Sequence, residues 1–128
     1  MIKRIAGVAL AGALALSVAG AAPAAAKDGD VIERGSCSSG AEWKLKLSPE
    51  NSKIEVEYEV DSNVNGQAWN VKIFKNGDRI FGGTRETTAP SGSFSVRVVT
   101  SDPAGTDDFR AKAVNGTTDE VCRGTASF

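Results

Sequence analysis

The residues that most enzymes use for covalent chemistry are scarce in this chain. Its 128 residues include no histidine, so neither a Ser-His-Asp nor a Cys-His arrangement can be built. Histidine-ligated zinc is excluded for the same reason. Gly82-Gly83 lacks the following helix and the lysine of a phosphate-binding loop. We therefore predict that the protein is not an enzyme, with no catalytic residue, no metal and no cofactor.

Carboxylates are the groups that could still do chemistry. Asp107 and Asp108 could act as an acid–base pair, although solvated turn residues are the simpler interpretation. Calcium would need about six to eight oxygens, and Asp102 shares a loop with this pair. The next acidic pair, Asp119-Glu120, is expected at the opposite end of the fold. The two groups are therefore not expected to share an ion.

The first 26 residues have the layout of a secretory signal peptide. Lys3 and Arg4 precede an apolar run, and Ala24-Ala25-Ala26 forms an A-x-A cleavage site. We expect the mature chain to be secreted into the extracellular or cell-wall space, with no membrane association after cleavage. In that oxidising setting Cys37 and Cys122 are expected to form one disulfide, with free thiols as the alternative.

Length and charge narrow the possibilities further. Residues 27–40 are polar and rich in Gly and Ser, which predicts an irregular segment, and 41–128 is long enough for one domain. The whole chain has a net charge of −1, and loss of the basic signal segment makes it more acidic. A mildly acidic surface argues against nucleic acid or anionic membranes as partners.

Polar and apolar residues alternate with period two through most of the mature chain, which indicates about seven short strands. No helical pattern of usable length follows Ala26. We predict an all-β, antiparallel two-sheet sandwich. If 42–47 and 53–60 form a hairpin with Leu47 opposite Ile54, Lys46 lies opposite Glu55 and Lys44 opposite Glu57, as a lysine–glutamate ladder.

A second hairpin yields a candidate binding patch. Asn76-Gly77 between alternating runs is a strong hairpin signal. With Lys75 opposite Asp78, Phe74 faces Arg79 and Lys72 faces Phe81. These four residues would form an aromatic, basic patch if Trp69, Val71 and Ile73 point to the core. Burial of the rings by a neighbouring loop is the alternative.

Three features resemble an immunoglobulin-type sandwich. Trp69 lies on a strand where such domains bury a tryptophan, a tight hairpin follows, and residues 107–116 are similar to the penultimate strand pattern D-x-x-Y-x-C-x-A-x-N. Phe109 takes the place of the tyrosine and Ala111 that of the cysteine, so the usual central disulfide is missing. The whole chain also resembles small secreted sandwich proteins of actinobacteria, most of which have no assigned activity.

These observations favour a non-enzymatic binding domain whose partner is an unknown protein or cell-wall ligand. A protease inhibitor is one alternative, with Thr84 to Gly92 as the inhibitory loop. A carrier that holds a small ligand between the sheets is another. The fold itself does not distinguish them, since sandwiches host many unrelated sites.

Overall fold

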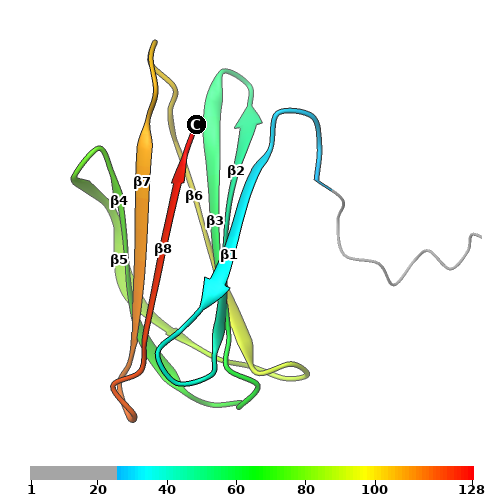
Figure 1. Ribbon diagram of the computed structural model, residues 1–128, viewed down its shortest axis with the longest axis vertical. Helices are drawn as coiled ribbons and strands as arrows, with labels where there is room; N and C mark the ends of the chain where they lie inside the picture. The colour runs from blue at the N-terminus through cyan, green and yellow to red at the C-terminus, as the bar shows by residue number, and fades with distance from the viewer. Residues whose placement is uncertain (1–25) are drawn as a thin grey trace, which may run out of the picture.

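The computed structural model describes residues 26–128 and confirms the predicted all-β sandwich. Eight strands pair into two four-stranded antiparallel sheets, in the orders β1-β2-β3-β6 and β5-β4-β7-β8 (Figure 1). The strands are β1 (Val31–Ser36), β2 (Glu42–Glu50), β3 (Lys53–Asp61), β4 (Ala68–Lys75), β5 (Asp78–Glu86), β6 (Ser93–Ser101), β7 (Asp108–Asn115) and β8 (Val121–Ser127). Nearly all of the predicted signal peptide lies outside the described residues.

Strand β1 lies within the segment 27–40, for which the sequence predicted no regular structure. It pairs with β2 from Val31 opposite Leu47 to Ser36 opposite Glu42. Backbone hydrogen bonds to an existing strand order this segment, and such bonds do not require a period-two pattern of its own. The expected count of about seven strands is therefore corrected to eight.

The register of the first predicted hairpin is shifted by two residues. Pro49, not Leu47, lies opposite Ile54, because Asn51 and Ser52 alone make the turn, with φ of 50° and 66°. Two consecutive residues with positive φ are the signature of a type I′ hairpin turn. A shift of two keeps every side chain on its expected face. The lysine–glutamate ladder survives with Lys46 opposite Glu57 and Lys44 opposite Glu59.

The core fills the space between the two sheets with the inward side chains of both. Trp69, Tyr58 and Phe109 are its largest members, and all are almost fully buried. The predicted disulfide between Cys37 and Cys122 is confirmed. Beside it, the Tyr58 hydroxyl donates a hydrogen bond to the Cys122 carbonyl oxygen at 3.1 Å, which joins β3 to β8 across the core.

The edge where β1 and β8 approach one another is closed by Trp43. Its indole lies against Gly35 of β1 and Gly124 of β8. A Cβ atom added to Gly35 would come within 2.7 Å of the ring, and one added to Gly124 within 2.8 Å. The two glycines therefore make room for the ring. Among residues 26–128 no helix is long and apolar enough to cross a membrane.

Candidate binding surface

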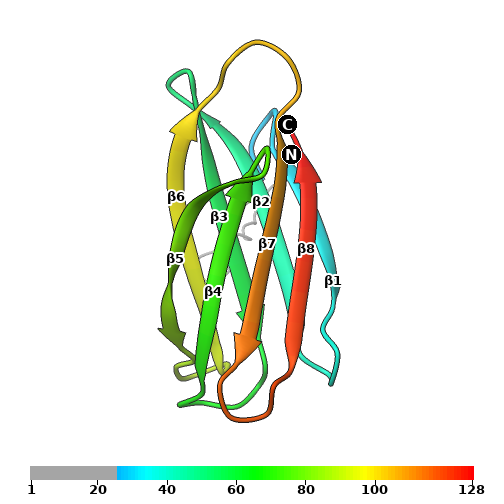
Figure 2. The same cartoon turned by 90° about the vertical axis from the view of Figure 1, so that its left-hand side faces the viewer.

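The outer face of the β5-β4-β7-β8 sheet, which is in front in Figure 2, carries five outward-pointing cations. Strands alternate inward and outward side chains, and β4, β7 and β8 do so without interruption. We call this set the basic face, and its members are Lys72, Arg79, Arg110, Lys112 and Arg123. Four of the five are exposed and Lys112 is half-buried.

Strand pairing arranges the basic face in two rows. Lys72 lies opposite Lys112, which lies opposite Arg123, so three cations stand side by side on neighbouring strands. In the adjacent row, Phe74 lies between Arg79 on β5 and Arg110 on β7. Like charges directly opposite one another are destabilising. This face therefore carries a charge arrangement that folding alone does not favour.

Phe74 and Arg110 form the centre of the second row. The Arg110 guanidinium carbon lies 4.8 Å from the centroid of the Phe74 ring, within the range of a cation–π contact. A hollow of about 240 Å³ opens beside this pair. It is lined by Asn70, Lys72, Phe74, Arg110, Lys112, Val114 and Arg123. Four of the five cations thus converge on one depression of the surface.

The two sheets differ in how their charges are compensated. Within residues 26–128 no member of the basic face takes part in an ion pair. On the other sheet, Lys44 pairs with Glu59 at 3.5 Å and Arg97 with Glu55 at 3.1 Å. The β1-β2-β3-β6 sheet therefore has cross-strand ion pairs on its outer face, whereas the basic face has none among the described residues.

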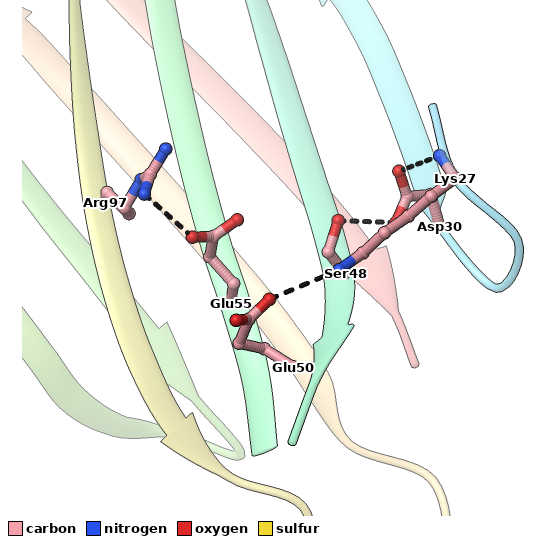
Figure 3. Close-up of polar contacts among 6 residues, drawn as sticks. All are labelled: Lys27, Asp30, Ser48, Glu50, Glu55 and Arg97. Carbon is pink, nitrogen blue, oxygen red and sulfur yellow. Dashed lines mark hydrogen bonds and ion pairs between the residues drawn. The ribbon is translucent and has the colours of Figure 1, made fainter. Parts of the chain in front are cut away.

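Figure 3 shows ion pairs and hydrogen bonds on the β1-β2-β3-β6 sheet and in the segment that precedes β1. Lys27 reaches Glu50 at 3.2 Å, and its backbone N–H donates to Asp30 at 2.8 Å. A hydrogen bond from the Ser48 hydroxyl is the main cause that lowers the pKa of Asp30 below its ordinary value of 3.8. A larger hollow, about 510 Å³, opens farther along this sheet. Two cations line this hollow, Arg34 and Lys44, together with the acidic residues Glu42, Glu59 and Asp61, and Lys44 is paired with Glu59.

Of the four residues predicted as a patch, three belong to the observed surface and Phe81 does not. A β-bulge at Ile80 places Phe81 opposite Ile73, an inward residue, and leaves Lys72 opposite Gly82. Phe81 therefore packs against the edge of the core. Arg85 lies over its ring, 4.9 Å from the centroid. This corrects the expected position of Phe81, because the extra residue of the bulge reverses the facing of the chain beyond it.

The carboxylates considered for chemistry do not form a joint site. Asp107 is buried, and its Oδ1 accepts a hydrogen bond from Asn76 Nδ2 at 2.9 Å, whereas Asp108 is exposed and accepts one from Ser127. Glu120 is buried and accepts hydrogen bonds from the backbone N–H groups of Ser39 and Ala41. It belongs to the connection between β7 and β8, which lies at the opposite end of the sandwich from the connection between β6 and β7 (Figure 1). Among residues 26–128 no three acidic side chains are grouped as a metal site would require.

The segment proposed as an inhibitory loop is shorter than expected. Thr84 to Glu86 belongs to β5, and Thr87 is held by hydrogen bonds to Gln67 and to the Val64 carbonyl oxygen. Gly92 is buried against the neighbouring loop, where a Cβ atom would come within 2.3 Å of the Val64 nitrogen. The two ends of the remaining turn, Thr87 and Gly92, are therefore buried, whereas residues 88–91 between them are exposed.

Arg110, Lys112 and Arg123 were not predicted as site residues. The sequence Arg110-Ala111-Lys112 does show that both cations share one face of a strand. It does not show that this strand pairs with β4, which follows only from the tertiary structure. No protein-family model, curated protein or solved structure matches this chain.

Proposed function

We propose that this protein is a secreted, non-enzymatic binding domain whose ligand binds the basic face. One observation carries the proposal: five cations share one sheet face, and none has an acidic partner within residues 26–128. On the outer face of the other sheet, by contrast, Glu59 and Glu55 form ion pairs with Lys44 and Arg97. An anionic ligand would supply the missing countercharge.

The cost of this arrangement in stability supports a binding role. Lys112 has a cation directly opposite on each side, Lys72 and Arg123. Each such pair opposes folding, while a glutamate at Lys112 would turn both pairs into attractive ones. Residues that lower stability in this way are commonly kept for function.

Export is part of the same proposal. The amino-terminal segment has the three-part layout of a signal peptide, and the disulfide between Cys37 and Cys122 is a bond that forms and persists in oxidising compartments. We also propose that the domain is immunoglobulin-like. Strands β2-β3-β6 and β4-β7-β8 pair in the orders that strands A-B-E and C-F-G take in that fold. Kinship with secreted actinobacterial proteins stays a prediction.

A co-sedimentation experiment tests the proposal. The mature chain, residues 27–128, is mixed with cell envelopes of the producing organism and centrifuged. We expect the wild type to sediment with the envelopes and the double variant Lys112→Glu/Arg123→Glu to remain in solution. The control, Arg34→Glu/Lys53→Glu, reverses two exposed cations of the other sheet and should behave as the wild type.

Circular dichroism and thermal melting establish that all three proteins are folded. Equal sedimentation of the three proteins would contradict the proposal, because binding would then not depend on the basic face. Failure of the wild type to sediment at all would contradict it as well.

A further inference from the structure

We infer that the ligand of the basic face is an acidic polysaccharide, a glycan chain that carries carboxylate, sulfate or phosphate groups. The inference rests on the proposed function and names the chemical class of the ligand. Three properties of the face lead to it: the spacing of the cations, the small volume of the hollow, and the polar and aromatic groups that accompany the charges.

The cations are spaced to meet a series of anionic groups. Lys72, Lys112 and Arg123 stand on three adjacent strands, and neighbouring strands are about 4.8 Å apart. The second row, which includes Arg79 and Arg110, lies two residues farther along the strands, or about 7 Å away. A single carboxylate or phosphate can contact only part of this array, whereas a chain with repeated anionic groups can contact all of it.

The hollow favours a ligand that lies across the surface. Its volume of about 240 Å³ is below the roughly 300–1,000 Å³ of pockets that enclose small molecules. Arg110 and Arg123 on its rim offer guanidinium groups that can bind carboxylate, sulfate or phosphate through two hydrogen bonds. Phe74 holds the Arg110 side chain by the cation–π contact, so less side-chain freedom is lost when an anion binds.

The other groups of the face fit a glycan better than a nucleic acid. Proteins that bind single-stranded nucleic acid stack the bases on exposed aromatic rings. On the described strands of this face the aromatic ring is that of Phe74, which Arg110 covers. Asn70 lines the hollow, and Thr125 lies opposite Arg110. Their amide and hydroxyl groups can exchange hydrogen bonds with sugar hydroxyls.

The experiment titrates the mature chain with four polymers. Dextran sulfate and polygalacturonate are acidic glycans, neutral dextran shares the backbone of the first without its charge, and a thymidine oligonucleotide is a polyanion without sugar hydroxyls on its exterior. We expect binding to both acidic glycans, none to dextran, and weaker binding to the oligonucleotide. Lys112→Glu/Arg123→Glu should lower the affinity for the acidic glycans about tenfold or more.

Two further readouts make the outcome decisive. The slope of log affinity against log salt concentration should fall by roughly 1 for each cation that is removed. Arg34→Glu/Lys53→Glu should leave affinity and slope unchanged. Tighter binding of the oligonucleotide than of either glycan would overturn the inference. If the wild type bound no acidic glycan but still sedimented with envelopes through the basic face, the inference would fail while the proposed function stood.

Discussion

Lys112 of β7 and Arg123 of β8 lie directly opposite one another on the outer face of their sheet, with no acidic partner within the described chain. Lys72 stands opposite Lys112 on its other side. Cross-strand charge pairs contribute about 0.2–1 kcal/mol each. The row is therefore a site where stability and binding are expected to respond to mutation in opposite directions.

Lys112→Glu should raise the free energy of unfolding, because it converts two repulsive pairs into attractive ones, each worth about 0.2–1 kcal/mol. Urea denaturation at low ionic strength measures the change, and added salt should reduce it. Lys46→Glu is the matched control, since it places a like charge opposite Glu57 and should lower stability. A loss of stability in Lys112→Glu would show that the row is not repulsive.

Gly124→Ala should lower the free energy of unfolding by about 1–3 kcal/mol, the usual effect of overpacking a well-packed site. The added Cβ atom would come within 2.8 Å of the Trp43 ring. Gly82→Ala is the control, since its Cβ atom would meet only the flexible Arg79 side chain, at 3.4 Å. Trp43→Leu should relieve the clash, so the two substitutions combined should cost less than their sum. If the stability effects of the two substitutions simply added, the contact between the Trp43 ring and the residue at position 124 would be contradicted.

Tyr58 is the one tyrosine of the chain, so absorbance at 295 nm reports its ionisation alone. Burial raises the pKa of Tyr58 above its ordinary value of 10.0. Above that value the unfolded chain loses this proton before the folded protein does, so stability should fall as the pH rises. We expect the phenolate to appear only as the protein unfolds. Ionisation of folded protein near pH 10 would contradict the burial.

Tyr58→Phe tests the bond between the sheets. Loss of the hydrogen bond to the Cys122 carbonyl oxygen should cost about 1 kcal/mol at neutral pH. The same variant has no phenol to ionise, so its stability should decline less steeply than that of the wild type between about pH 9 and 12. Chemical denaturation across that range measures how steeply the stability of each protein declines with pH. Equal slopes would show that ionisation of Tyr58 does not cause the decline.

Phe81→Ala and Phe74→Ala should separate packing from binding. Phe81 packs against the core edge, so its loss should lower the free energy of unfolding by about 1–3 kcal/mol and leave dextran sulfate binding unchanged. Phe74→Ala releases Arg110 and should weaken binding several-fold. Thermal melting and glycan titration measure both effects. If Phe81→Ala weakened glycan binding and Phe74→Ala lowered stability instead, the observed positions of the two side chains would be contradicted.

The sequence alone was sufficient for the fold class and the disulfide. Period-two patterns such as that of 53–60 identify strands locally, because alternate side chains of a strand face opposite sides. Two cysteines allow a single pairing, and Cys37–Cys122 is the observed bond. Asn76-Gly77 likewise identified its hairpin, with φ of 49° and 88° at the turn. Each of these conclusions depends on local pattern or on counting.

Strand register and facing needed more than the local pattern. The first hairpin was placed two residues from its observed register, because Ser48-Pro49-Glu50 reads as a turn but continues β2. Phe81 was expected on the wrong face because nothing in the sequence marks Ile80 as the residue of a bulge. The hairpin register and the facing of Phe81 are both determined by the pairing of each strand with its neighbour.

The candidate site, too, could be predicted only in part from the sequence. Lys72, Phe74 and Arg79 lie on one hairpin, so sequence proximity was enough to group them. Arg110, Lys112 and Arg123 join them only because β7 pairs with β4, about forty residues away in the chain, and β8 pairs with β7. Charge patterning within a strand determines which way a cation points, but long-range pairing decides which cations become neighbours. The basic face is therefore a product of tertiary structure.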